Sequence, residues 1–273
     1  MIITIITQKG EFRKMAQEVS MPQKGEVIIE ARDIVKNYGH LQALRGASLQ
    51  IYAGEITALL GDNGAGKSTM ANIICGAIPR TSGQLICRGK EIDVQSIQQA
   101  QDMGIQVVYQ DLALAPDLSV PYNIFLGREI IKDTFWGRLF HLLDTKKMTE
   151  ISKQHLADLG IGLKSMSVPV KSLSGGERQS LAVAKAVAWC TSALIMDEPT
   201  AALGARQQAL VYQTMRAAAN KNLGVLVISH DIPKMLEVAD RICIMRQGKV
   251  IANLIAKETN LQTVLSLMLT GQA

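Results

Sequence analysis

A glycine-rich loop at residues 61–68, with the sequence GDNGAGKS, carries the clearest chemistry in the chain. It has the form G-x-x-x-x-G-K-S, in which backbone N–H groups wrap a phosphate chain that side chains would otherwise keep at a distance. Lys67 can reach the β- and γ-phosphates of a nucleotide, and Ser68 offers a hydroxyl to Mg²⁺. The residues that this pattern predicts to contact the phosphates are Gly61, Asp62, Asn63, Gly64, Ala65, Gly66, Lys67, Ser68 and Thr69.

The segments on either side of the loop have the patterns of elements that would hold it. The apolar residues at 55–60 predict a short buried strand, and the segment from Lys67 through Ile74 predicts a helix. Bound phosphates would then meet a helix N-terminus, where unpaired N–H groups and the helix dipole favour negative charge. The alternative is a glycine-rich turn with a chance lysine, but it does not explain the strand, the spacing and the helix together.

Two acidic residues follow a second apolar run. Residues 193–196 (ALIM) predict a buried strand, and Asp197 and Glu198 stand directly after it. Because an open α/β sheet binds its ligands at the carboxyl ends of the strands, we expect both carboxylates beside the phosphate loop. Asp197 would hold the metal, usually through water, and Glu198 would act as general base on the attacking water. The alternative is a surface acidic pair at the end of a strand.

Two further segments stand between and beyond these. Residues 173–177 (LSGGE) precede a helical pattern with Ser174 as the natural N-cap, so a capped helix after a loop is the purely structural interpretation. His230 follows the apolar run 225–228, and a lone histidine after a strand is more often structural than catalytic. Neither segment establishes a function alone, and both gain meaning from the order of all four along the chain.

Together, the four segments resemble the ATP-binding subunit of an ABC transporter, over roughly residues 27–255. The resemblance implies an α/β fold: a P-loop NTPase core with a mainly parallel sheet, an N-terminal antiparallel β subdomain and an inserted helical subdomain at roughly residues 96–170. We expect residues 25–273 to form this ABC ATPase domain. We expect residues 1–24 to lie outside it, as a misassigned start or a frayed, disordered extension. The sequence shows no internal repeat, so we expect one ATPase unit.

The resemblance also implies roles that the residues alone do not establish. Ser174, Gly175, Gly176 and Glu177 would contact the γ-phosphate of the ATP bound by the opposite subunit. Glu177 stands where many relatives have glutamine, and this variant is tolerated in the family. His230 matches the switch histidine that contacts the γ-phosphate, and we prefer this role to the structural one.

Two weaker assignments depend on the family entirely. Tyr38 matches the aromatic residue that stacks on adenine, a contact worth on the order of 1 kcal/mol, and the alternative is a surface tyrosine of a β-hairpin. Gln110 matches the glutamine that meets Mg²⁺ and the lytic water, and the alternative is a polar residue that ends a strand. The implied catalytic residues are therefore Glu198, His230 and Gln110, and the implied Mg²⁺ ligands are Ser68, Gln110 and Asp197.

One position departs from the family pattern. Most ABC ATPases have an aspartate where Gly204 stands, and it contacts the partner subunit across the dimer, so its absence puts that contact in doubt. The sequence AALG at 201–204 does resemble the single-domain ATPases of bacterial simple-sugar importers. The segments 108–114 and 123–129 resemble the same subfamily. This resemblance lies in the amino-acid sequence between the motifs and not in residues with a chemical role.

Composition sets further limits. The apolar fraction of 48% can fill a core, and the aromatic fraction of 4% makes that core mostly aliphatic. A net charge of +5 suits an anionic membrane face or a nucleic acid. Without a long basic run or interleaved aromatic residues, however, we expect no nucleic acid partner. The cysteines have no paired spacing and predict reduced, mostly buried thiols of a cytosolic protein. No apolar run is long enough to cross a bilayer, so a channel would need separate subunits.

Several other segments have recognisable patterns. Residues 242–251 predict a hairpin with its turn at Gln247–Gly248, and Arg88–Gly89 predicts another turn. Residues 207–221 predict a helix between the strands that precede Asp197 and His230, an alternation that favours a parallel sheet. The bulky residues at 134–141 (TFWGRLFH) would either pack inside or face a partner, and packing is the more frequent explanation.

The resemblance implies a mechanism in which two subunits share each site. Two ATP molecules would hold a head-to-tail ATPase dimer closed, with a homodimer expected, and hydrolysis would release it. The leading hypothesis is uptake of a monosaccharide through separate membrane permease subunits, supplied by a periplasmic or extracellular sugar-binding protein. The ATPase would then be peripheral, at the cytoplasmic face of the inner membrane. The alternatives are an ABC ATPase for another solute, in export or import, and a soluble ABC protein acting on ribosomes or DNA.

Overall fold

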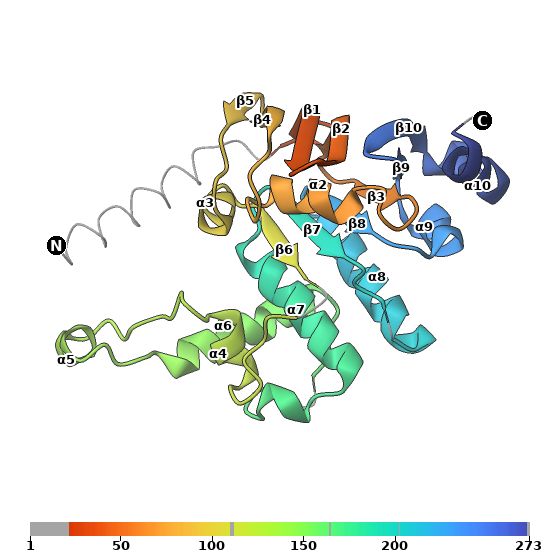
Figure 1. The fold of residues 1–273 in the computed structure, drawn as a ribbon. Coiled ribbons are helices and arrows are strands. Elements are labelled where there is room, and N and C mark those ends of the chain that lie inside the picture. Colours follow the sequence, from red (N-terminus) through yellow and green to blue (C-terminus); the bar gives the residue numbers. More distant parts are fainter. Residues whose placement is uncertain (1–21, 110–111, 164, 202, 272–273) are drawn as a thin grey trace.

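The fold is built around two β-sheets (Figure 1). The structure is a computed structural model that describes residues 22–109, 112–163, 165–201 and 203–271. The antiparallel sheet has the order β2–β1–β4–β5, from Val27–Tyr38 (β1), Leu41–Tyr52 (β2), Ser82–Cys87 (β4) and Lys90–Ile92 (β5). The larger sheet has the order β10–β9–β3–β8–β7–β6, from Ile56–Leu60 (β3), Gln106–Val108 (β6), Ala193–Asp197 (β7), Gly224–Ile228 (β8), Arg241–Arg246 (β9) and Lys249–Ile255 (β10).

Five strands of the larger sheet run parallel, and only β10, at the edge, pairs antiparallel with β9. The helices in the described part of the chain are Lys67–Ile74 (α2), Ile97–Asp102 (α3), Val120–Ile124 (α4), Phe135–Leu139 (α5), Thr145–Asp158 (α6), Gly175–Trp189 (α7), Ala205–Ala219 (α8), Ile232–Val238 (α9) and Leu261–Thr270 (α10). Two short 3₁₀ turns span Val170–Ser172 (η1) and Ala256–Glu258 (η2). The predicted α/β fold with a mainly parallel sheet and an N-terminal antiparallel sheet is confirmed.

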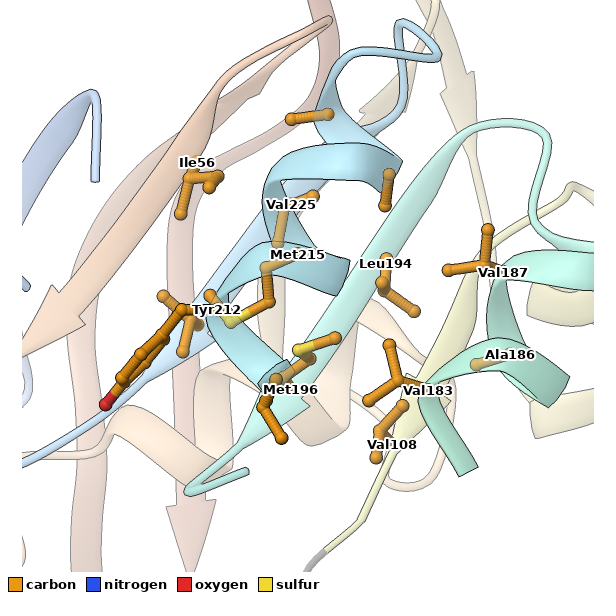
Figure 2. Close-up of a cluster of buried hydrophobic side chains, with 14 of the residues drawn as sticks. Ile56, Val108, Val183, Ala186, Val187, Leu194, Met196, Tyr212, Met215 and Val225 are labelled. Atoms are coloured by element: carbon orange, nitrogen blue, oxygen red, sulfur yellow. The ribbon is translucent and has the colours of Figure 1, made fainter. Parts of the chain in front are cut away.

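The parallel sheet divides the interior into two cores. Because side chains alternate along a strand, Leu194 and Met196 of β7 face one side and Ile195 faces the other. Leu194 and Met196 pack against α7 and α8, and Figure 2 shows Val183 of α7 and Met215 of α8 gathered around them. Ile195 packs in the second core, which also contains the buried residues of α2 and of the antiparallel sheet. Helices α2 and α7 therefore lie on opposite faces of one sheet.

Both predicted hairpin turns are present. Arg88 and Gly89 have φ angles of 49° and 74°, and Gln247 and Gly248 have φ angles of 48° and 78°. Two consecutive positive φ angles are the requirement of a type I′ turn, which joins antiparallel strands tightly. The turn at 247–248 brings the start of β10 back alongside β9, and it also touches the phosphate loop, as described below.

The middle of the chain contains the helices α3 to α6 together with β6, which pairs with β7 in the main sheet. The stretch at 96–170 is therefore partly core sheet, and its division into a helical subdomain stays a proposal. No helix in the part of the chain that the structure describes has the length and apolarity to cross a membrane.

Helix α5 contradicts the interpretation that the sequence favoured for residues 134–141. Phe135, Trp136, Leu139 and Phe140 have exposed fractions of 75%, 61%, 56% and 62%, so they do not pack inside. Figure 1 shows the reason: α5 lies at the end of a hairpin that projects away from both sheets, out of reach of either core.

Candidate functional site

The glycine-rich loop joins the end of β3 to the start of α2, as the flanking patterns predict. Its backbone is curled by a hydrogen bond from the Ala65 N–H to the Asp62 carbonyl oxygen (3.1 Å). The hairpin turn between β9 and β10 supports it from behind, because Gly248 N–H donates to the Ala65 carbonyl oxygen (2.9 Å). Asp62, Asn63 and Gly64 are exposed, whereas Gly61 and Ala65 are buried, so the loop is open to solvent in its middle and braced at Ala65.

Two glycines of the loop are required by close contacts. A Cβ at Gly61 would lie 2.1 Å from the carbonyl oxygen of Met245, and backbone cannot give way as a flexible side chain can. A Cβ at Gly66 would lie 2.7 Å from Leu44 Cδ2, and its φ of 105° is unfavourable for any other residue. The spacing of glycines therefore reflects both the curl of the loop and its tight seat against β9 and β2.

Lys67 lies inside this curl. Its Nζ donates to the carbonyl oxygens of Gly61 (2.7 Å) and Asp62 (2.9 Å), and the residue is only 6% exposed. Burial lowers the pKa of Lys67 from its ordinary value, and the charges of Glu198, Asp197 and Asp62 oppose that change. The ammonium group is thus held in the loop with carboxylates nearby, where an anionic phosphate would be attracted strongly because little water screens it.

The strand order places the acidic pair and the histidine beside the loop. Ile228 of β8 is paired with Leu59 of β3 on one side and with Asp197 of β7 on the other. Because these neighbouring strands are parallel, the residues that follow them meet at one edge of the sheet. The phosphate loop follows β3, His230 follows β8 and Glu198 follows β7, so segments far apart in the chain converge there.

Glu198 and His230 are in direct contact across this edge. The Oε1 atom of Glu198 lies 2.7 Å from Nε2 of His230, and both side chains are partly exposed, at 34% and 45%. Glu198 also has a φ of 48°, an unusual conformation for a residue with a side chain, and its N–H donates to the Ile228 carbonyl oxygen (3.0 Å). Strain of this kind is concentrated at functional positions, where a side chain must point in one direction.

Ser174 begins α7 with a complete capping box. Its Oγ accepts from the Glu177 N–H (3.3 Å), and Glu177 Oε2 accepts from the Ser174 N–H (2.8 Å). The glutamate in place of the common glutamine therefore closes the first turn of the helix. Helix α7 packs on the face of the sheet opposite to α2, the helix that follows the phosphate loop.

Gly204 is the N-cap of α8 and has no side chain with which to cap it. The N–H of Gly204 instead donates to Oε1 of Gln207 (3.3 Å). The aliphatic part of Gln207 covers Gly176, where an added Cβ would lie 2.4 Å from Gln207 Cγ. The segment that lacks the usual aspartate is thus packed against the start of α7, and Gly176 must be glycine for that packing.

The two assignments that depended on the family, Tyr38 and Gln110, both stay predictions. Tyr38 ends β1 beside the turn to β2, 47% exposed, with Lys36 Nζ 5.0 Å from its ring centre. An exposed ring is available for stacking, but it is also what a hairpin surface tyrosine would show, so the adenine contact stays a prediction. Gln110 lies outside the described residues, as do residues 1–21 of the predicted N-terminal extension.

The sequence reasoning missed two residues that hold the segment after Gln110. The side-chain amide of Asn123, which is fully buried, donates to the carbonyl oxygens of Ala115 (3.0 Å) and Leu118 (3.1 Å) and accepts from the Ala115 N–H (2.8 Å). Lys185 of α7 donates from Nζ to the Ala113 carbonyl oxygen (3.0 Å). For Asn123, the only signal in the sequence was an asparagine inside an otherwise apolar helical turn. For Lys185, the sequence contained no signal.

The oxygen donors at the site fit Mg²⁺, although no cluster of three or more His, Cys, Asp or Glu side chains able to hold a metal occurs among the described residues. Mg²⁺ needs no such cluster, because it is usually held by one or two protein oxygens together with phosphates and water. The hydroxyl of Ser68, exposed on the first turn of α2, and the carboxylate of Asp197 are donors of this type.

Comparison with known proteins places the chain among ATP-binding subunits. Residues 44–201 match a family model described as ABC transporter. The xylose/arabinose import ATP-binding protein XylG of Sulfolobus acidocaldarius is 44% identical over 241 residues, which are 88% of this chain and 93% of that protein. The fructose import ATP-binding protein FrcA of Rhizobium meliloti is 41% identical over 244 residues, 89% of this chain and 94% of that protein.

More distant matches agree with these. The ribose import ATP-binding protein RbsA of Caldanaerobacter subterraneus is 34% identical over 227 residues, and the match covers 44% of its length. Among solved structures, the ADP conformation of MJ1267, an ATP-binding cassette of an ABC transporter, superposes with a TM-score of 0.75 at 23% identity, over 89% of this chain and 94% of that one. At that identity the likeness supports the fold.

Proposed function

The chain belongs to the ABC transporter family, and on this premise we propose that it is the ATP-binding and ATP-hydrolysing subunit of an importer for a monosaccharide. The two relatives that it matches over nearly their whole length are ATP-binding proteins for import of xylose or arabinose and of fructose. Because their sugars differ, the similarity supports the class of substrate and not one sugar. The permease and the binding protein would select the sugar.

The observation that carries the proposal is the meeting of four groups at one edge of the parallel sheet. The phosphate loop with Lys67 follows β3, Asp197 and Glu198 follow β7, and His230 follows β8. The ammonium group of Lys67 lies within the loop, where it would attract phosphates. The 2.7 Å contact with His230 holds one carboxylate oxygen of Glu198 in position at the same edge of the sheet. This set can bind a nucleoside triphosphate and prepare water for attack on its terminal phosphate.

In the mechanism, Lys67 would turn from the loop carbonyls to the β- and γ-phosphates, and the N–H groups at the start of α2 would surround them. Glu198 would accept the proton of the attacking water, while His230 holds the carboxylate in position and contacts the γ-phosphate. Mg²⁺, held by Ser68 and Asp197 with Gln110 as the third assigned ligand, would neutralise charge on the phosphates. Tyr38 would stack on the adenine.

Each site would be completed by a second subunit. Ser174, Gly175, Gly176 and Glu177 begin α7, which packs on the face of the sheet opposite to α2, and in a head-to-tail homodimer they would face the ATP of the partner. Gly204, with only a hydrogen in place of the usual aspartate, cannot make that residue's contact across the dimer. With no side chain at Gly204, only the backbone at the start of α8 would be available to contact the partner subunit. The subunit would act at the cytoplasmic face of the cell membrane, bound to its permease.

The test is reconstitution. The protein would be co-expressed with a candidate sugar permease and sugar-binding protein from the same organism, placed in vesicles, and supplied with labelled xylose, arabinose, fructose and ribose. ATP-dependent accumulation of one of these sugars, lost in Lys67→Ala, is the expected result. Robust ATP hydrolysis with uptake of no monosaccharide would reject sugar import, and purification with ribosomes or DNA but no membrane subunit would reject the transporter role.

A further inference from the structure

The projecting hairpin at residues 130–144 carries an exposed aromatic cluster that the ATPase site does not use. The chain has only 4 Phe and 2 Trp residues, and Phe135, Trp136 and Phe140 stand together on this one hairpin. The ring centres of Phe135 and Trp136 are 5.4 Å apart, and those of Trp136 and Phe140 are 5.7 Å apart in a stacked arrangement. With Leu139 they form what we call the aromatic tip.

The aromatic tip stands on a well-defined support. Residues Ile131 and Leu143 form an antiparallel bridge, and Lys132 N–H donates to the Leu142 carbonyl oxygen (2.8 Å). Thr134 Oγ1 accepts from the Gly137 N–H (3.0 Å) and so caps α5. A Cβ at Gly137 would lie 2.4 Å from the Lys132 carbonyl oxygen, so the chain is folded closely on itself there. The rings are therefore held outward by a hairpin with its own hydrogen bonds.

Exposure of these four large side chains to water is unfavourable, because each has apolar area whose burial would be stabilising. An exposed apolar patch of this kind marks a surface that contacts a protein or a membrane. Trp and Phe rings are enriched at the boundary between lipid headgroups and acyl chains. Helix α5, with five residues, is far too short to cross a bilayer but long enough to lie within that boundary. The shape and composition thus suit a lipid surface.

The charges around the aromatic tip identify the kind of lipid. Residues 128–147 contain five basic and three acidic side chains, a net charge of +2. Of the acidic ones, Asp133 is paired with Arg138, and Asp144 caps α6 by accepting from the Lys147 N–H. Glu129 is exposed as well, so the three exposed lysines Lys132, Lys146 and Lys147 leave the solvent-facing charge of the hairpin and its base net positive. Basic groups of this kind are attracted to a bilayer that contains anionic lipid.

We propose that the aromatic tip inserts into the headgroup region of an anionic bilayer and there anchors the ATPase subunit beside its permease. The proposal rests on the proposed function only for the presence of a membrane, because the rings and lysines would bind lipid without any permease. The tip adds a contact with the lipid itself to whatever contacts the subunit makes with protein.

The test is binding of the purified full chain to vesicles without any other protein. Vesicles of phosphatidylcholine, with and without phosphatidylglycerol, would be separated by flotation and the bound fraction measured. We expect binding to the anionic vesicles, and a loss of at least about tenfold in partitioning for Phe135→Ser/Trp136→Ser/Phe140→Ser, since three large rings leave the interface. The matched control is Leu41→Ser/Leu269→Ser, which removes side chains that are 66% and 69% exposed elsewhere, and it should bind as the wild type does.

Two further readouts locate the contact. Trp136 fluorescence should shift to the blue on binding, and Trp136→Phe should bind but lose that shift, because the other tryptophan, Trp189, already donates from Nε1 to the Ile124 carbonyl oxygen inside the fold. Lys132→Gln/Lys146→Gln/Lys147→Gln should remove the preference for phosphatidylglycerol, as should high salt.

Several results would overturn the proposal. They are equal binding by the triple-serine variant and the wild type, no binding of the wild type to either vesicle, and loss of a dimer in solution in the triple-serine variant. ATP hydrolysis in solution is measured for every variant and should not change, so a failure to bind lipid is distinguishable from a failure of the ATPase.

Discussion

Replacing Glu198 by glutamine would isolate the charge of the assigned general base. Oε1 of Glu198 lies 2.7 Å from His230 Nε2, and a glutamine oxygen can accept a hydrogen bond from the same nitrogen. The φ of 48° at this position is no more unfavourable for glutamine than for glutamate. The variant therefore keeps the shape, the backbone and one hydrogen bond of the native residue, and it loses only the negative charge that activates water.

The expected effect on rate is much larger than the expected effect on stability. Removal of a general base typically lowers the rate by about 10²–10⁴-fold, a barrier increase of roughly 3–5 kcal/mol. The Glu198–His230 contact is partly exposed, with side chains 34% and 45% accessible, so a contact of this kind stabilises the fold by no more than about 1 kcal/mol. The melting temperature should fall by no more than about 4 °C.

The assays are steady-state ATP turnover, nucleotide binding by calorimetry and gel filtration with Mg-ATP. Lys67 is unchanged, so ATP should bind, and binding without hydrolysis should accumulate the closed, ATP-filled dimer. The wild type should elute as monomer or as a mixture. Glu237→Gln is the matched control, because it makes the same substitution in an exposed ion pair with Lys234, and it should leave turnover unchanged.

Turnover by Glu198→Gln at the wild-type rate would refute the assignment of the base. Gln110 or His230 would then have to position the water. Loss of turnover together with loss of ATP binding would also count against the reasoning, since the charge of Glu198 would then act on the nucleotide and not on the water.

Four other changes test separate parts of the site and fold. Lys67→Ala should weaken ATP binding at least about tenfold, since a charge-assisted hydrogen bond is worth roughly 1.5–3 kcal/mol; calorimetry showing affinity within a few-fold of wild type would contradict the site. Ser174→Arg should leave nucleotide binding intact but block hydrolysis, and persistent turnover would reject the shared site. Gly66→Ala should destabilise the fold by about 1–3 kcal/mol in urea unfolding, because its Cβ would meet Leu44 at 2.7 Å; an unchanged midpoint would show that the loop can relax. Burial lowers the pKa of His155, which contacts the Ala184 carbonyl oxygen at 2.8 Å, so the folded state should lose stability as pH falls below the ordinary value of 6.5. His155→Gln should flatten that loss in thermal melts, and identical pH profiles would contradict it.

The local elements of this protein could be predicted from the sequence because their causes are local. The loop at 61–68 is specified by its own glycines, α7 by the Ser174–Glu177 capping box, and the turn at 247–248 by two residues with positive φ. Each depends on contacts between residues a few positions apart, and a motif records such contacts directly. The buried strands could be predicted for a similar reason, since a short continuous apolar run fits a sheet covered on both faces.

Only the tertiary structure decided how these elements meet. The contact between Glu198 and His230 depends on β8 lying between β3 and β7, an order that is set by packing of the whole sheet. The need for glycine at 61 arises from Met245, and the need for glycine at 176 arises from Gln207, both distant in the chain. The same reason explains the error at 134–141: bulky apolar residues predict burial only where a core is within reach, and the hairpin carries them beyond it. Spacing along the chain specifies local geometry, whereas the choice of neighbours depends on how all the apolar surface is buried together.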